Sequence, residues 1–304
     1  MAGISAAEGG CGPEVFLFLM IAAALLHPDV SPKTVDRFRS SGVEIKVLKT
    51  LEDPTNYSAV LIFGGDGTVH RHLPQLHRQK IPMLVVPTGS GNDFAKALGI
   101  RNVATALQAW QQFCAQGEKG EAKNVKEIDL GVIRSGGQET FFCCVAGIGV
   151  DAEANARANR MPPWLKSRGG YVLAALQSLI AFKPAEMTIS AEGREIRRSA
   201  FFIAVGNARS YGGGMEVTPQ ATLDDGLLDV CLVNKMNKLK LLCWVPTIFF
   251  GEHLRLKQVE YFQARQVAID TERKLDIYAD GDCAGQTPVQ IGLIPRGLRV
   301  IVPG

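Results

Sequence analysis

Two glycine-rich segments, each directly after a run of apolar residues, carry the strongest chemical signal in this sequence. Gly64-Gly65-Asp66-Gly67-Thr68 follows the run Ala59–Phe63, and Pro87–Asp93 (PTGSGND) follows the run Met83–Val86. Such runs predict parallel strands that are covered on both faces. Glycine-rich turns at the carboxyl ends of these strands let backbone N–H groups approach phosphate oxygens, and the next helix N-terminus attracts the same anion. We therefore expect both loops to line one phosphate site.

Asp66 in the first loop indicates that a divalent cation takes part in binding. A carboxylate repels phosphate unless a divalent cation lies between them, so Asp66 indicates a Mg²⁺–nucleotide complex and not a bare dinucleotide. The alternative is an ordinary turn in which Asp66 caps a helix. In the second loop Ser90 supplies a hydroxyl donor, and Asn92 or Asp93 can cap the next helix, so capping alone stays an alternative there too.

The elements that must position these loops alternate between strand and helix up to about residue 126. Expected strands are Val15–Leu26, Val43–Leu48, Ala59–Phe63 and Met83–Val86, and expected helices are Ser31–Ser41, Thr68–Arg78, Asp93–Leu98 and Val103–Cys114. Repeated strand–helix units imply a parallel sheet. The polar segment 116–126 is expected to be a linker.

From Glu127 onward the pattern changes to many short strands, with a hairpin turn expected at Glu192-Gly193. The expected strands are Ile128–Arg134, Thr140–Val145, Glu186–Ser190, Ser199–Val205, Leu227–Val233, Gln266–Thr271, Leu275–Ala279, Val289–Ile294 and Leu298–Val302. Helical stretches are expected at 164–182 and 237–250. This predicts an α/β nucleotide-binding domain with a parallel sheet (residues 1–126), an antiparallel β-sandwich domain (residues 127–304), and an active site in the cleft between them.

Composition narrows the class of protein. The 304 residues are 46% hydrophobic and 21% charged, as in globular proteins. The net charge of +3 disfavours a nucleic-acid partner. Seven cysteines without a CxxC pair indicate reduced thiols and a cytoplasmic protein. The apolar run Val15–Leu26 is too short to span a membrane and has no basic start like that of a signal peptide.

The loops, together with later motifs, resemble the diacylglycerol kinase catalytic domain family, especially the soluble bacterial lipid kinases. The similarity continues, in the same order, through Phe142–Glu153 (FCCVAGIGVDAE), Val205–Val230 and Tyr278–Asp282 (YADGD), and covers roughly residues 42 to 304. The resemblance implies ATP-dependent phosphorylation of a lipid hydroxyl. It also implies that the second domain binds the lipid.

The resemblance also implies roles for individual residues. Nucleotide would be bound by the loop Gly64–Thr68, by the second loop (Gly89, Ser90, Gly91 and Asn92) and by Thr50 after the second strand. A structural Mg²⁺ would be held by the carboxylate of Asp225 and the backbones of Thr222 and Leu227. Asp282 would be the catalytic base, with Asp66 and Asp280 supporting the catalytic site.

Three departures from the family pattern are visible. The family has Asp-Gly-Glu where this chain has Asp280-Gly281-Asp282, so the base is one methylene shorter. The helix after the first loop has His70-Arg71 where the family usually has Asn-Glu. His27-Pro28-Asp29 replaces a glycine-bearing loop near the N-terminus. These departures leave open a lipid-binding relative without catalysis. An NAD kinase-like enzyme is a second alternative, because the GGDGT motif also occurs in NAD kinases.

A lipid kinase must reach its substrate in a bilayer, so a transient, peripheral contact with the membrane surface is expected. Trp164 is flanked by Arg157, Arg160, Lys166 and Arg168 without an acidic residue, a pattern that suits an anionic surface. The alternative is that Trp164 begins a buried helix. The identity of the lipid and the presence of a homodimer are left open.

Overall fold

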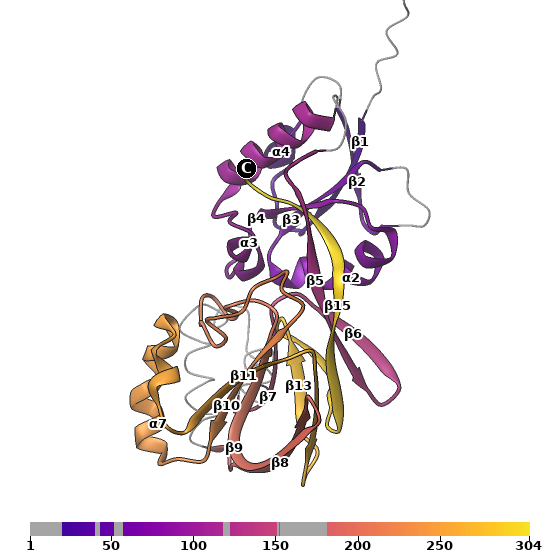
Figure 1. Cartoon of the computed structure of the whole chain (residues 1–304). Coiled ribbons are helices and arrows are strands. Elements are labelled where there is room, and N and C mark those ends of the chain that lie inside the picture. Colours follow the sequence, from indigo (N-terminus) through magenta and orange to yellow (C-terminus); the bar gives the residue numbers. More distant parts are fainter. Residues whose placement is uncertain (1–19, 40–42, 52–56, 118–121, 151, 153–180) are drawn as a thin grey trace, which may run out of the picture.

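The computed structural model describes residues 20–39, 43–51, 57–117, 122–150, 152 and 181–304. The expected architecture is confirmed, with an α/β half built on parallel strands and a second half built as an antiparallel β-sandwich (Figure 1). The helices are α1 (Pro32–Asp36), α2 (Asp66–Gln79), α3 (Asp93–Ala97), α4 (Val103–Gly117), α7 (Lys238–Trp244) and the 3₁₀ segments η2 (Val245–Phe250) and η3 (Glu252–Arg255). The strands are β1 (Met20–Leu26), β2 (Val43–Leu48), β3 (Ala59–Gly64), β4 (Met83–Pro87), β5 (Val125–Ser135), β6 (Gln138–Phe142), β7 (Val145–Gly149), β8 (Ala185–Ala191), β9 (Arg194–Gly206), β10 (Leu228–Asn234), β11 (Val259–Ala264), β12 (Gln266–Thr271), β13 (Asp276–Ala279), β14 (Asp282–Gln286) and β15 (Val289–Ile301).

The first half is a parallel sheet in the strand order β4-β3-β1-β2. All residues of β3 and β4 are buried, which explains why these strands appear in the sequence as unbroken apolar runs. The two glycine-rich loops leave the sheet at the carboxyl ends of these neighbouring strands. This edge is where open parallel sheets bind ligands.

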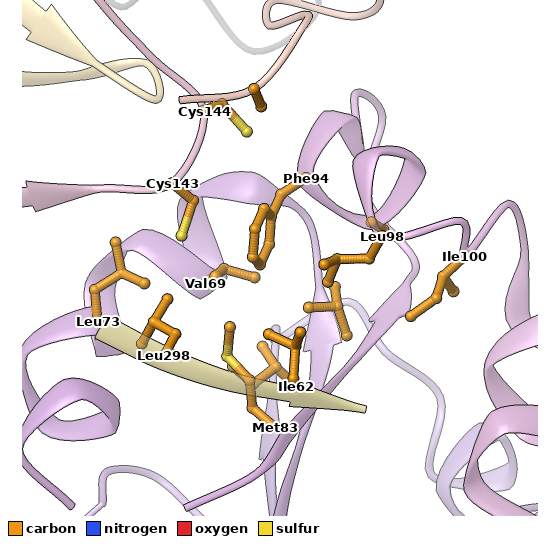
Figure 2. Packing of buried hydrophobic residues seen from close by; sticks show 14 of the residues in the cluster. Ile62, Val69, Leu73, Met83, Phe94, Leu98, Ile100, Cys143, Cys144 and Leu298 are labelled. Atoms are coloured by element: carbon orange, nitrogen blue, oxygen red, sulfur yellow. The ribbon is translucent and has the colours of Figure 1, made fainter. Parts of the chain in front are cut away.

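Helices α2 and α3, which follow the two loops, are fixed by the core beneath them. Val69, Leu73 and Leu76 of α2 are spaced to form one apolar face, and all three are buried. Figure 2 shows side chains from five elements meeting there: Ile62 (β3), Val69 and Leu73 (α2), Met83 (β4), Phe94 (α3) and Leu298 (β15). The loops are therefore held between two rigid strands and two packed helices.

The second half consists of antiparallel pairs, among them β7–β9, β8–β9, β9–β10 and β10–β11. The expected hairpin turn is confirmed between β8 and β9, where Glu192 and Gly193 adopt φ angles of 48° and 74°. Two successive residues with positive φ are typical of a two-residue hairpin turn. The sandwich has its own core, formed largely by the buried faces of β8, β9, β10, β12 and β15.

Three strand expectations were wrong. The single strand Thr140–Val145 is divided into β6 and β7, since the N–H groups of Cys143 and Cys144 donate to a side chain, Asp280, instead of a neighbouring strand. The strands at 289–294 and 298–302 form one strand, β15, with an irregularity between Ile294 and Leu298. Strands β11 and β14 were not expected, and β14 (DCAGQ) is too polar and glycine-bearing to show a strand pattern.

Strand β15 connects the two halves. Its beginning pairs with β12 in the sandwich, and Val300 near its end pairs in parallel with Met83 of β4. No helix within the described ranges combines the length and apolarity needed to cross a membrane. Trp164 and the bases around it, like most of the helical stretch expected at 164–182, lie outside the described residues.

Candidate active site

The two glycine-rich loops meet backbone to backbone. The carbonyl of Gly64 accepts a hydrogen bond from the N–H of Thr88 (N···O 3.1 Å), which continues the β3–β4 pairing into the loops. A Cβ atom on Gly89 would lie 2.6 Å from Cα of Gly65, closer than real Cβ atoms approach. Glycine is therefore required by the close approach of the two loops, and both loops lie at one site as the sequence predicted.

Asp66, the first residue of α2, holds the second loop. Its Oδ2 accepts a hydrogen bond from the N–H of Asp93 and its Oδ1 accepts one from the N–H of Phe94, both at 3.0 Å. These are two of the N–H groups that the start of α3 leaves without helical partners. Burial raises the pKa of Asp66, the two N–H donors oppose this, and the charges of Asp93 and Asp280 raise it further. Asp66 thus caps a helix, but that helix is α3 and not its own.

Asn92 fixes the shape of the second loop. It adopts a left-handed φ of 55°, and its side chain both accepts a hydrogen bond from the N–H of Gly89 (3.1 Å) and donates one to the Gly89 carbonyl (2.6 Å). Gly67 and Ser90 are exposed, whereas the side chain of Thr68 is buried over Gly64. The exposed residues of the two loops are Gly67, Thr88, Gly89 and Ser90, and their backbone N–H groups and hydroxyls suit contact with a phosphate.

The second half of the chain brings Asp280 to these loops. Asp280 and Gly281 form the two-residue turn between β13 and β14, with φ angles of 50° and 94°. The carboxylate of Asp280 accepts hydrogen bonds from the N–H groups of Cys143 (2.7 Å), Cys144 (2.9 Å) and Val145 (3.2 Å). Three N–H donors fix this side chain firmly, so Asp280 positions the turn that carries Asp282.

His70 of α2 links the two halves at the same place. Its Nδ1 lies 3.5 Å from Oδ2 of Asp280, and only 12% of its side chain is exposed. Burial lowers the pKa of His70, but the carboxylate of Asp280 beside its ring and the charge of Asp282 outweigh that effect, so the pKa is raised. Asp282, at the start of β14, is exposed. The position where this chain departs from the family's usual Asn thus lies beside Asp280, two residues before Asp282 in the chain.

Asp93 is a residue of the site whose part the sequence did not reveal. It is almost fully buried, and its Oδ2 accepts a hydrogen bond at 2.6 Å from the N–H of Gly213, which belongs to the second half of the chain. From sequence, Asp93 is an ordinary helix-capping residue, and nothing in its neighbours indicates a partner 120 positions away. Asp66, Asp93 and Asp280 together gather negative charge at the junction of the two halves.

Thr50 and the expected Mg²⁺ ligands have no hydrogen bond to the two glycine-rich loops among the contacts of the described residues. Thr50 is exposed after β2, at the same sheet edge as the loops, but β1 separates β2 from β3, so the two loop regions are roughly 10 Å apart. The turn containing Asp225 is held against β5, where Asp129 accepts a hydrogen bond from the N–H of Gly226 (2.8 Å). Thr222 and Leu227 flank this turn.

Oxygen atoms at the Asp225 turn and at the two loops are suitable ligands for a magnesium ion. In the turn, Oδ1 of Asp225 accepts the N–H of Leu227 (3.0 Å), and Oδ2 and the nearby carbonyls are the oxygen ligands that Mg²⁺ prefers. At the loops, Mg²⁺ bound with nucleotide phosphates usually needs only one or two protein carboxylates. Within the described ranges no group of three or more His, Cys, Asp and Glu side chains is arranged to hold a metal ion by itself.

Comparison with known proteins agrees with this geometry. Residues 24–133 match the model of the diacylglycerol kinase catalytic domain, and residues 144–302 match that of the YegS C-terminal NAD kinase beta sandwich-like domain. A diacylglycerol kinase of Mycobacterium tuberculosis is 35% identical over 253 residues, which cover 81% of this chain and 77% of that protein. The diacylglycerol kinase of Bacillus subtilis is 27% identical over 252 residues (81% and 78%).

Two solved structures share the fold. A diacylglycerol kinase from Bacillus anthracis superposes with a TM-score of 0.66 at 19% identity, covering 94% of this chain and 97% of that one. An NAD kinase from Archaeoglobus fulgidus in complex with ATP superposes with a TM-score of 0.51 at 15% identity, covering 93% and 94%. At these identities the likeness is one of fold.

Proposed function

Since the chain belongs to the diacylglycerol kinase catalytic domain family, we propose that it transfers the γ-phosphate of ATP to the hydroxyl of a membrane lipid such as diacylglycerol. One observation carries the proposal. The turn Asp280–Asp282, from the second half of the chain, is held beside His70 on the helix that follows the first glycine-rich loop. This contact supports the proposal because it brings the turn that carries the Asp282 carboxylate to the helix that follows the first loop.

The loops would bind and orient ATP. Their glycines let backbone N–H groups reach the phosphates, and the N-terminus of α2 supplies a favourable electrostatic field. Phosphoryl transfer depends mainly on positioning and on neutralising charge, so rigid loops suit the task. The hydrogen bonds from Asp66 to the start of α3 and from Asn92 to Gly89 supply this rigidity.

Asp282 would accept the proton of the lipid hydroxyl as that oxygen attacks phosphorus. Because Asp282 is exposed at the start of β14, it can face an acceptor arriving from outside. Asp280 would position it through the N–H groups of Cys143 to Val145. The side chain is one methylene shorter than the family's Glu, and His70, which contacts Asp280, takes the position where the family has Asn.

Magnesium would be held with the nucleotide phosphates near Asp66, and a structural ion near Asp225. The ion at the phosphates would neutralise negative charge on the transferring group. Asp66 suits this role because its carboxylate, already accepting two N–H groups, still has lone pairs that can face a cation. With Asp93 and Asp280 nearby, a cation would also relieve the repulsion among the three carboxylates.

Transfer of label to competing acceptors tests the proposal. The purified protein is incubated with Mg²⁺, γ-labelled ATP, NAD and vesicles that contain diacylglycerol, phosphatidylglycerol, a sphingoid base and undecaprenol. The proposal predicts label in the lipid phase, in one of these alcohols. Label in NAD would establish the NAD kinase-like alternative, and a folded protein that labels neither would support a non-catalytic lipid-binding relative.

A further inference from the structure

An exposed apolar and basic surface covers α7 and η2 in the second half of the chain. Leu239 and Phe250 are 73% and 76% exposed, and Leu242 and Phe249 are 37% and 43% exposed. Among the described residues, the only other large apolar side chain with comparable exposure is Val47 on β2. We call residues 235–251 the α7–η2 surface; Figure 1 shows α7 at the outer margin of the second half.

Contacts on the inner side of α7 and η2 hold these apolar side chains in exposed positions. Asn237 caps α7 by accepting the N–H of Leu239 (2.8 Å), and Leu241 turns its side chain into the core. In η2, Val245 and Ile248 pack against the core, and the Ile248 carbonyl accepts the N–H of Glu216 (2.9 Å). The segment is thus anchored on its inner side while Leu239, Phe249 and Phe250 face outward.

Every charged side chain of residues 235–251 is a lysine, and the carboxylate of Glu216 lies close to this segment in space, beside Gly251. Residues 230–251 contain Lys235, Lys238 and Lys240 and no Asp or Glu. The next acidic residue, Glu252, is paired with Arg255 (2.7 Å), which neutralises it. All three lysines are exposed beside the apolar side chains. Exposed apolar side chains next to bases suit a bilayer, which has an apolar interior and anionic headgroups at its boundary.

We propose that the α7–η2 surface docks on a bilayer that contains anionic lipids, an inference that rests on the proposed lipid kinase function. Phe250 and Leu239 would enter the boundary between headgroups and acyl chains, and the lysines would contact anionic headgroups. A second copy of the chain suits this surface less well. A two-fold interface would bring two copies of the same positively charged patch together.

The docking surface is connected to the candidate active site through one short segment. The N–H of Glu216 is bonded to η2 at Ile248, and Met215 pairs with Tyr211 across a short bridge. Between them Gly213 donates its N–H to Asp93 at the start of α3 (2.6 Å). Residues 211–216 thus lie between the bilayer contact and the loops proposed to hold ATP, so docking would fix the orientation of the site relative to the membrane.

Vesicle co-sedimentation with matched variants tests the proposal. The double variant Leu239→Ser/Phe250→Ser removes exposed apolar area from the α7–η2 surface. The control variant Val47→Ser removes exposed apolar area from β2. The double variant should partition at least about 10-fold less onto vesicles of mixed phosphatidylcholine and phosphatidylglycerol. The double variant Lys238→Gln/Lys240→Gln should partition about 30-fold less, because each base near an anionic surface contributes about 1 kcal/mol. The control double variant Lys33→Gln/Lys274→Gln, which removes two lysines outside this surface, should partition like wild type. Binding by both α7–η2 variants equal to wild type would overturn the proposal.

Activity separates docking from catalysis. The Leu239/Phe250 variant should lose transfer to long-chain diacylglycerol in vesicles but keep wild-type transfer to a short-chain diacylglycerol dissolved as monomers. If wild type binds vesicles through this surface but phosphorylates no lipid in either form, the proposed function fails and docking stands. If sedimentation velocity shows a dimer that the Leu239/Phe250 substitutions convert to monomer, the surface is an interface between copies and the docking proposal is wrong.

Discussion

At the scale of single residues, the four Asp carboxylates where the two halves of the chain meet differ in the hydrogen bonds that they accept. Asp66 accepts two N–H groups from the start of α3, Asp93 accepts one from Gly213, and Asp280 accepts three from Cys143 to Val145. Asp282 is exposed. Three of the four therefore build the site, and the fourth can meet a substrate.

Asp66→Ala should lower both stability and activity. Losing the acceptor leaves two N–H groups of α3 without their partner, and we expect the free energy of unfolding to fall by about 1–3 kcal/mol. Phosphoryl transfer should be abolished, since the loop would lose its shape and a carboxylate for Mg²⁺–ATP. Thermal denaturation and kinetic assays measure the two effects separately. A folded variant with nearly the full kcat/KM would contradict the role given to Asp66.

His70→Asn should change the pH dependence of stability. The pKa of His70 is raised in the folded protein, so the protonated imidazole stabilises the fold. This contribution is complete below the unfolded pKa of about 6.5 and is lost as the pH rises through the folded pKa. Urea unfolding should therefore show a larger loss of stability for the variant at about pH 5.5 than at about pH 8.5. An equal loss at both values would show that His70 does not act through its charge.

At the scale of elements, the glycine-rich loops were predictable because they follow buried strands of unmistakable composition. Strands β2 and β12 have the expected bounds, and β3 and β4 extend one residue beyond them. The carboxyl ends of adjacent parallel strands must lie together, so the meeting of the two loops followed from the strands alone. The bond from Asp66 to α3 was not predictable, because a capping Asp normally serves its own helix.

Glycine substitutions in the two loops should have opposite effects on stability. Gly89→Ala places a Cβ 2.6 Å from Gly65 Cα and should force the loops apart, with a loss of stability and of ATP affinity. Gly67 has open space around its Cβ position and lies inside α2, so Gly67→Ala should keep or raise stability by up to about 1 kcal/mol. Differential scanning calorimetry and ATP titration measure these effects. Similar destabilisation by both changes would refute the close approach of the loops.

At the scale of the whole molecule, the two halves depend on each other. Strand β15 begins in the sandwich and ends against β4, and Asp93–Gly213 and His70–Asp280 join the loops to the second half. The sequence indicated an α/β half followed by an antiparallel β-sandwich half, and this architecture is confirmed. It did not indicate these contacts, because their partners lie more than 100 positions apart and have no local pattern.

The central claim is that Asp282, from the second half, activates a lipid hydroxyl toward ATP held by loops of the first half. Asp282→Asn keeps the size of the side chain and removes its basicity, and Asp282→Glu restores the family residue as a matched control. The deciding measurement is single-turnover transfer of γ-label from Mg²⁺–ATP to diacylglycerol in vesicles, with ATP affinity measured in parallel. The account predicts a single-turnover rate constant lower by roughly 100-fold or more for Asp282→Asn, with ATP affinity nearly unchanged, and an active Asp282→Glu. Full transfer by Asp282→Asn would contradict it.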